Sequence, residues 1–242
     1  MRKRCEGMKP ELDTVKSHPN SFAEANSRLQ TVDARLADAY GRPEWVSHGS
    51  PIDELIGTVL SQHTSDTNTA RAYASLREHF PEWSDVAAAS TEDIVSAIRS
   101  GGLANLKAPR IQRVLRELDA QLGTLSLDAL AGQSLEEARR WLVSLPGVGL
   151  KTASCVLLFS LGLPAMPVDT HVHRVCLRLG LIAPYTTADA AHYALESMIG
   201  PNREVAYRLH LNLIQHGRAV CKARAPLCRR CVLADICPSA RN

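Results

Sequence analysis

The sequence predicts an all-α protein. Apolar residues recur at helical spacing through most of the chain, and no stretch shows the convincing alternation of a half-buried strand. Proline and glycine divide these periodic stretches into short segments joined by turns. With 242 residues and 45% apolar content, the chain can bury a substantial core in one large domain or two small ones.

Composition limits the compartment and the partners. The chain has no run of eighteen apolar residues, and its N-terminus lacks the apolar region of a signal peptide. We therefore expect a cytoplasmic, nucleoid-associated protein with no membrane partner. The net charge of +3 permits nucleic-acid binding without requiring it, so any binding patch must be local.

The N-terminal third predicts a tail and three helices. Residues 1–20 are polar and aperiodic, which is typical of a flexible tail. A helix is expected over 21–40, with candidate core residues Phe22, Leu29, Val32 and Leu36. A second helix begins near Ile52, and its apolar face is Ile52, Leu55, Ile56, Val59 and Leu60. The polar stretch 61–66 separates it from a third helix over 67–79, for which Asp66 is a candidate N-cap.

The central part predicts a short helix and a long basic one. Thr91 is the expected N-cap of a helix over 91–100, which Gly101 and Gly102 end. The next helix carries the basic residues Lys107, Arg110, Arg113 and Arg116. By themselves these arginines are more typical of a solvated stripe than of a phosphate-binding track.

Residues 135–153 predict two helices joined by a tight turn. Leu135–Ser144 forms the first helix, and Pro146 and Gly147 end it. Gly147 and Gly149 permit positive φ and close approach by a ligand. The turn of such a helix-hairpin-helix exposes backbone N–H groups at the start of the next helix, where an anion such as DNA phosphate can bind.

Lys151 and Asp169 are the candidate catalytic residues. Lys151 lies in the first turn after the hairpin, where the helix dipole and partial desolvation should lower its pKa. A neutral lysine amine is a nucleophile that can form a Schiff base. Asp169 precedes a helical run over 170–181, where a carboxylate can cap the helix or serve as a charged catalytic partner. Taken alone, each residue is more typical of a structural role, the lysine as a solvated side chain and the aspartate as a helix N-cap.

Four of the seven cysteines lie within seventeen residues, in a C-x6-C-x2-C-x5-C pattern. These are Cys221, Cys228, Cys231 and Cys237. The odd total and the lack of a secretory signal argue against a disulfide framework. Four close thiolates suit zinc or a [4Fe–4S] cluster, and spacing alone does not separate the two. Cys155 and Cys176 lie in apolar helical runs and are expected in the core.

These motifs carry a resemblance to a known family. LPGVGLKTA at 145–153, followed by PVDTHVHRV at 167–175, resembles the helix-hairpin-helix, Gly/Pro-rich loop and aspartate signature of the base-excision DNA glycosylases. The endonuclease III branch has lysine where Lys151 stands. The similarity runs from about Pro51 to Pro238, and the cysteine spacing matches the cluster loop of that branch, which implies a [4Fe–4S] cluster.

The resemblance implies a discontinuous architecture, the helix-hairpin-helix-GPD glycosylase fold. Residues 52–162 should form a helical barrel domain, and 21–51 with 163–242 an iron–sulfur cluster domain. Lys151 and Asp169 should face the cleft between the two domains.

The resemblance also implies the residues that touch DNA. His63 takes the position of a side chain that fills the space left by a flipped nucleotide, where endonuclease III has glutamine, and Gln62 lies beside it. Leu103 corresponds to a second wedge, followed by Ala104 where the family often has tyrosine. Lys222 and Arg224 lie in the cysteine loop, as a phosphate clamp does. The expected DNA-binding residues are Gln62, His63, Leu103, Gly147, Gly149, His171, Lys222 and Arg224.

We therefore expect a monomeric, bifunctional DNA glycosylase and abasic-site lyase that removes oxidised pyrimidines from double-stranded DNA containing damaged bases or abasic sites. Lys151 would attack C1′ and Asp169 would stabilise charge on the sugar.

Three alternatives stay open. A monofunctional mismatch or adenine glycosylase shares the aspartate and the cluster but typically lacks the lysine. A non-catalytic DNA-binding protein would keep DNA affinity without Lys151, and a zinc-stapled interaction module would be colourless.

Overall fold

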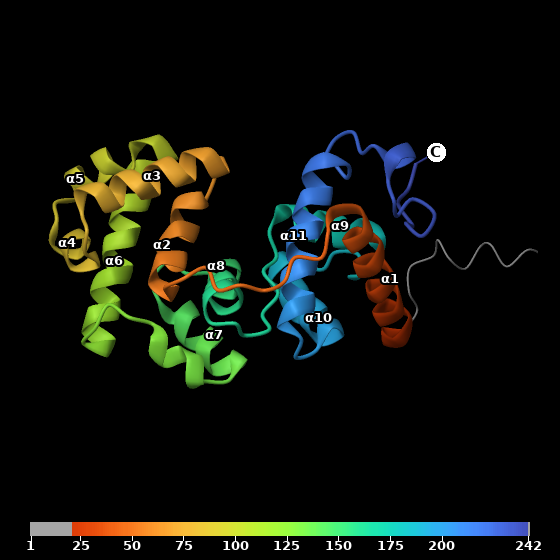
Figure 1. Cartoon of the computed structure of the whole chain (residues 1–242), viewed down its shortest axis with the longest axis horizontal. Helices are drawn as coiled ribbons and strands as arrows, with labels where there is room; N and C mark the ends of the chain where they lie inside the picture. Colours follow the sequence, from red (N-terminus) through yellow and green to blue (C-terminus); the bar gives the residue numbers. More distant parts are fainter. Residues whose placement is uncertain (1–20, 242) are drawn as a thin grey trace, which may run out of the picture. The chain divides into compact units, whose positions relative to one another are not determined.

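The computed structural model describes residues 21–241, and every regular element in that range is a helix, which confirms the all-α prediction (Figure 1). None of the described helices is long and apolar enough to cross a membrane. The main helices are α1 Phe22–Tyr40, α2 Pro51–Ser61, α3 Asp66–His79, α4 Trp83–Ala88, α5 Thr91–Ala97, α6 Ala104–Leu122, α7 Leu135–Ser144, α8 Leu150–Cys155, α9 Thr170–Leu179, α10 Ala188–Ile199 and α11 Arg203–Ala219. Four short elements are η2 Arg99–Gly101, η3 Asp128–Gly132, the π-helix η4 Val156–Ser160, and η5 Cys228–Arg230. The expected flexible tail, 1–20, lies outside the described residues.

The chain divides into two compact units. The first consists of the chain up to Arg42, Val168–Ile199 and the chain from Arg208 onward, and the second consists of Pro43–Pro167 with Gly200–Tyr207. Three segments that the resemblance assigned to the cysteine-containing domain, 43–51, 163–167 and 200–207, therefore belong to the second unit.

Trp45 explains why the start of α11 belongs to the second unit. Its indole Nε1–H donates to the carbonyl of Leu158 in η4 at 2.7 Å, and its backbone N–H donates to the carboxylate of Glu204 at 2.8 Å. The guanidinium of Arg203 lies 4.3 Å from the centroid of the Trp45 ring, at cation–π distance. The segment after Pro43 thus joins the first turn of α11 to η4.

The core of the second unit follows the predicted period. All five residues of the expected apolar face of α2, from Ile52 to Leu60, are at most 3% exposed. This face packs α2 against α3, α6, α8 and η4. The helical spacing of apolar residues therefore predicted both the element and its buried side.

In the first unit, α1 packs against α10, and α10 packs against α9. Leu29, Val32 and Leu36 of α1 are buried as predicted, but Phe22 is 58% exposed, so its assignment to the core was wrong. Phe22 is the first residue of α1, directly after the N-cap Ser21. At a helix end the apolar period does not by itself supply a packing partner.

Two predicted N-caps were each one residue too late. Ser65, rather than Asp66, accepts the backbone N–H of Asn68 at 3.3 Å and caps α3. Ser90 likewise caps α5, while Thr91 becomes the first helical residue and donates its hydroxyl to the Gln112 side chain. In both places serine directly precedes the expected residue, and serine caps a helix as well as aspartate or threonine does.

Candidate active site

The turn between α7 and α8 presents two glycines to solvent. Helix α7 starts with a capping box in which Ser134 accepts the backbone N–H of Glu137 at 3.3 Å, and it ends at Ser144 as predicted. Leu145 and Val148 are buried and anchor the turn, whereas Gly147 and Gly149 are exposed. The backbone of this turn is therefore accessible to a ligand.

Only one of these glycines adopts the positive φ that glycine permits. Gly147 has φ of +80°, while Gly149 has φ of −94° and serves as the N-cap of α8. A Cβ atom on Gly147 would also lie 2.9 Å from Nε of Arg110, but a Cβ on Gly149 meets no atom within 4 Å. Only Gly147 therefore uses the positive φ that glycine permits.

This difference predicts the stability of two alanine variants. Gly147→Ala should lower the free energy of unfolding by about 1–2 kcal/mol, because alanine is strained at positive φ. Gly149→Ala should leave it within about 0.5 kcal/mol, as for a substitution without strain or clash. Urea unfolding of both variants measures this difference, and equal destabilisation would contradict it.

Lys151 is the second residue of α8. Its side chain is half-buried, and α8 continues without a break into the π-helix η4. A lysine at this position lies at the positive end of the helix dipole. The structure confirms that Lys151 lies in the first turn after the hairpin.

Asp169 is the N-cap of α9. Its Oδ1 accepts the backbone N–H groups of His171 at 2.8 Å and Val172 at 2.7 Å. Both bonds use the same oxygen, and Oδ2 takes no part in the cap. The carboxylate is half-buried and can cap the helix while it presents its second oxygen to a ligand.

A buried histidine fixes the backbone before Asp169. The N–H of Val168 donates to Nε2 of His192 at 3.2 Å, and Nδ1 of the same ring lies 2.9 Å from the carbonyl of Ala188. Because Nε2 must accept, the ring is neutral and carries its proton on Nδ1. His192 is 1% exposed, so this contact lies in the core of the first unit. Asp169 belongs to this unit and Lys151 to the second, and the expectation that both face one cleft stays a prediction.

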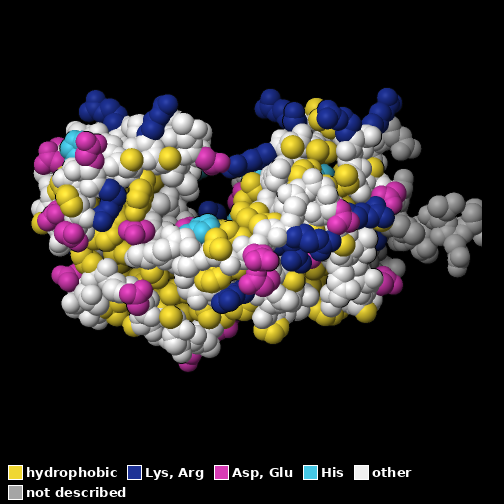
Figure 2. Space-filling view, in the orientation of Figure 1, with side chains coloured by type: hydrophobic (Ala, Val, Ile, Leu, Met, Phe, Trp, Pro, Cys, Tyr) yellow, Lys and Arg dark blue, Asp and Glu magenta, His cyan; other side chains and the backbone are white. Residues whose placement is uncertain are grey.

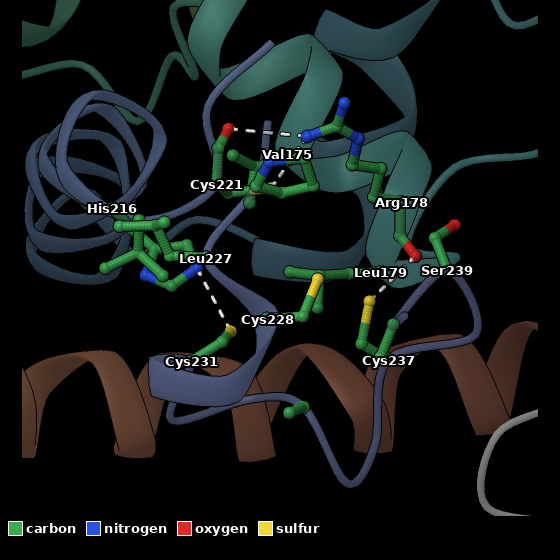
Figure 3. A pocket seen from close by; sticks show the side chains of 14 residues that line it. Val175, Arg178, Leu179, His216, Cys221, Leu227, Cys228, Cys231, Cys237 and Ser239 are labelled. Atoms are coloured by element: carbon green, nitrogen blue, oxygen red, sulfur yellow. Dashed lines mark hydrogen bonds between the residues drawn. The ribbon is translucent and has the colours of Figure 1, made fainter. Parts of the chain in front are cut away.

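The four C-terminal cysteines line one cavity in the first unit (Figure 3). The cavity has an empty volume of about 400 Å³, which includes its open mouth. Its walls are mainly apolar, with Val175 and Leu179 from α9 and Leu227 from the cysteine loop. Sequence elements separated by about fifty residues thus enclose the thiols.

Two arginines of α9 hold the cysteine loop. The guanidinium of Arg178 donates to Sγ of Cys221 at 3.3 Å and to the carbonyls of Lys222 and Ala223, each at 2.8 Å. One turn earlier, Arg174 donates to the carbonyl of Cys221 at 3.1 Å. The helix that Asp169 caps therefore carries the cations that fix this loop.

Cys231 lies against a neutral histidine. Its Sγ is 3.5 Å from Nε2 of His216, whose Nδ1 is 2.9 Å from the hydroxyl of Tyr40. Burial lowers the pKa of His216 to about 4, so the ring is uncharged at neutral pH. The backbone N–H of Leu233 also donates to Sγ of Cys231, at 3.4 Å.

The donor set of this cavity fits an iron–sulfur cluster. Among residues 21–241, no three His, Cys, Asp or Glu side chains are grouped to hold a single metal ion. The four thiols surround the cavity instead, and a [4Fe–4S] cluster takes one cysteine on each iron. N–H donors to the sulfurs and apolar walls are the surroundings that tune such clusters.

Comparison with known proteins places the chain in a family. A sequence model of the HhH-GPD superfamily of base excision DNA repair proteins matches residues 56–201, more than half of the chain. The chain belongs to the HhH-GPD superfamily. This finding confirms the resemblance that the hairpin and the aspartate indicated.

Individual relatives agree with the HhH-GPD assignment. Over 169 residues the chain is 40% identical to a putative DNA glycosylase of Arabidopsis thaliana, covering 70% of this chain and 57% of that protein. Over 196 residues it is 38% identical to endonuclease III of Thermotoga maritima, covering 79% and 84%. The solved structure of a trapped endonuclease III–DNA covalent intermediate superposes with a TM-score of 0.74 at 30% identity, covering 89% of this chain and 96% of that one.

Within this HhH-GPD protein, the two expected wedge residues have unusual backbones. His63 follows the end of α2 with φ of +54°, and Leu103 is the N-cap of α6 with φ of +51°. His63 is exposed and Leu103 is 50% exposed. Gln62 differs, because its side-chain oxygen accepts a hydrogen bond from Arg110 at 2.6 Å. The structure therefore favours His63 over Gln62 as the projecting side chain.

The remaining expected DNA contacts lie in the first unit of the HhH-GPD chain. Lys222 and Arg224 are exposed, and Figure 2 shows Lys and Arg side chains gathered around this C-terminal segment. The ring of His171 is half-buried, with Nδ1 at 3.1 Å from the guanidinium of Arg174. His171 is thus held next to the arginine that fixes the cysteine loop.

Sequence reasoning missed Arg174, Arg178 and His192. The two arginines are four residues apart, which predicts one helix face. Their partners in the cysteine loop lie 43 to 47 residues away, and no local pattern identifies them. His192 gave no signal, because an apolar helical stretch surrounds it.

Proposed function

We propose that this protein is a bifunctional DNA glycosylase and abasic-site lyase that removes oxidised pyrimidines from double-stranded DNA. The observation that carries this proposal is a half-buried lysine, Lys151, in the first turn after an exposed glycine hairpin. A relative with 30% identity forms a covalent intermediate with DNA, which supports a nucleophile in the same family. We further propose that the protein acts as a monomer.

Two basic or N–H-rich surfaces would bind the DNA backbone. The exposed turn at Gly147 and Gly149 can bring backbone N–H groups to a phosphate. Lys222 and Arg224 add positive charge from the loop that Arg178 holds. His63 and Leu103 would then occupy the space left in the base stack while the damaged nucleotide rotates outward.

The chemistry follows from Lys151 and Asp169. The neutral amine of Lys151 attacks C1′ of the deoxyribose, the bond from C1′ to the base breaks, and the base leaves with the bonding electrons and takes up a proton. Asp169 stabilises the positive charge that develops on the sugar, through the oxygen that does not cap α9. The sugar ring opens to a Schiff base on Lys151. Removal of a C2′ proton then expels the 3′ phosphate by β-elimination.

Cys221, Cys228, Cys231 and Cys237 would hold a [4Fe–4S] cluster, which supplies rigidity to the basic loop between the first two ligands. The reaction above uses no electron transfer. Two further side chains contact the ligand sulfurs directly. Arg178 donates to the sulfur of Cys221, and His216 lies against that of Cys231.

The cluster predicts a difference between two cysteine variants. Cys231→Ala should lose the brown colour and bound iron, whereas Cys176→Ala should retain about four irons per chain. Cys176 is a buried core residue, and burial raises the pKa of its thiol. Visible absorption and iron analysis measure both variants. A colourless wild-type protein that contains zinc would contradict the proposal.

The activity is tested with a panel of duplexes. These contain an oxidised pyrimidine, a G·T mismatch, an A·G mismatch or an abasic site, and each is incubated with the protein with and without borohydride. Base release together with strand cleavage and a trapped adduct is the expected result for the oxidised pyrimidine. Base release without trapping would indicate a monofunctional glycosylase, and binding alone would indicate a DNA-binding protein.

A further inference from the structure

We propose that Lys107 ties two wedge loops, residues 61–64 and residues 101–103, into one rigid unit and is a positioning residue for base flipping. The loops contain His63 and Leu103, so this inference rests on the proposed function. It assigns a role to a buried lysine that belongs to neither the hairpin nor the cysteine loop.

Lys107 is a buried cation that bonds to both loops. Its side chain is 3% exposed, although it belongs to the basic series on α6. Nζ donates to the carbonyl of Leu60 at 2.7 Å and to the carbonyl of Gly101 at 2.8 Å. Leu60 lies in the last turn of α2, immediately before the first wedge loop, and Gly101 opens the second. One ammonium group therefore joins the starts of both loops.

Packing alone does not call for a lysine here. Burying an ammonium group is unfavourable, and burial lowers the pKa of Lys107 accordingly. A methionine of similar length would fill the same space without this cost. What lysine adds is a pair of strong hydrogen bonds to two carbonyls at helix ends, a place where carbonyls lack intrahelical partners.

Both loops contain strained backbone close to the bonded carbonyls. His63 follows Leu60 by three residues and Leu103 follows Gly101 by two, and each has positive φ without being glycine. Such conformations persist only where the surrounding structure fixes them. The carbonyl of Leu103 also accepts the backbone N–H of Lys107 at 3.0 Å. Lys107 thus holds the second loop through both its main chain and its side chain.

Arg110 extends the same face of α6 toward the hairpin. It lies one turn after Lys107, and its guanidinium donates to Gln62 at 2.6 Å. Its Nε lies 2.9 Å from the position that a Cβ of Gly147 would take. Side chains of α6 therefore contact both wedge loops and the hairpin turn. All of these residues belong to the second unit.

Loosening this connection should impair flipping more than chemistry. An intact damaged nucleotide must be rotated out of the stack, and both wedges must enter together to keep it there. An abasic nucleotide has no base to unstack, so Lys151 reaches its sugar with less help from the wedges. Base excision should consequently depend on Lys107 more strongly than trapping of a preformed abasic site does.

The test compares Lys107→Met with Arg113→Met, which removes one positive charge from the exposed side of the same helix. The readouts are single-turnover base excision, borohydride trapping on a preformed abasic duplex, and the fluorescence of 2-aminopurine placed beside the damaged or abasic nucleotide. For Lys107→Met we expect excision and the fluorescence rise to fall about tenfold or more, while trapping changes less than about threefold. Arg113→Met should leave all three unchanged.

A double-mutant cycle separates positioning from general destabilisation. If Lys107 acts through the second loop, adding Lys107→Met to Leu103→Ala should cause little further loss of fluorescence or excision. Additive losses, equal losses of excision and trapping, or no loss in Lys107→Met would each overturn the inference. Should Lys107→Met fail to fold, Lys107→Gln takes its place in the cycle, because glutamine is neutral and keeps a donor.

If the wild type excises no base from any duplex, the proposed function fails, and the fluorescence on the abasic duplex still decides the role of Lys107.

Discussion

Lys151→Gln is expected to abolish the borohydride-trapped adduct on an abasic-site duplex and to slow strand cleavage by roughly 10³-fold or more, as for loss of an enzymatic nucleophile. Glutamine is one bond shorter than lysine and carries an amide, which cannot form a Schiff base. The substitution lies at the second position of α8, where glutamine is a good helix former. The variant should therefore fold and still bind the duplex. The measurement is the fraction of DNA that becomes covalently attached to protein under borohydride.

Lys222→Gln is the matched control for this experiment. The side chain of Lys222 is exposed in the cysteine loop, while its carbonyl accepts the hydrogen bond from Arg178. This variant should bind DNA more weakly and with a smaller dependence on salt, yet form the adduct at saturating protein. A trapped adduct in Lys151→Gln would show that another amine is the nucleophile.

Asp169→Asn is expected to lower the rate of base excision by roughly 10²- to 10⁴-fold while it leaves stability almost unchanged. Asparagine keeps an oxygen that can accept the N–H groups of His171 and Val172, and it caps helices as well as aspartate does. What is lost is the negative charge that stabilises the developing positive charge on the sugar. Single-turnover excision and urea unfolding, measured on the same preparation, separate the two effects.

Asp169→Ala completes this comparison. Alanine removes both the charge and the cap, so its free energy of unfolding should fall by about 1 kcal/mol relative to Asp169→Asn. Excision should be similarly slow in the two variants. If Asp169→Asn retained the wild-type rate, Asp169 would be a helix cap with no catalytic role.

Several elements of the fold could be predicted because their causes are local. The buried face of α2 repeats every three to four residues, and every residue assigned to it is buried. Asp169 caps a helix that starts one residue later, through bonds that span two and three residues. Phe22 shows where this reasoning stops, because the same period continues to the exposed end of α1.

The sequence predicted the ligand set of the candidate metal site but not its surroundings. The spacing of the four cysteines identified them as a ligand set, since ligands that lie close in sequence stay close in any compact loop. That they line one cavity, with Val175 and Leu179 as walls, depends on how α9 packs against the loop. The bond from Arg178 to Cys221 spans 43 residues and has no counterpart in the spacing.

By itself the sequence determined the helices, the hairpin, the N-cap position of Asp169 and the cysteine set, because each rests on interactions within a few residues or on a short motif. Tertiary structure alone decided that Lys107 is buried against Leu60, 47 residues away, and that His192 supports Val168, 24 residues away. A basic residue on a helix is expected in solvent unless a distant partner compensates its burial. The carbonyls of Leu60 and Gly101 are such partners, and only the packing of α2 and η2 against α6 brings them to Lys107.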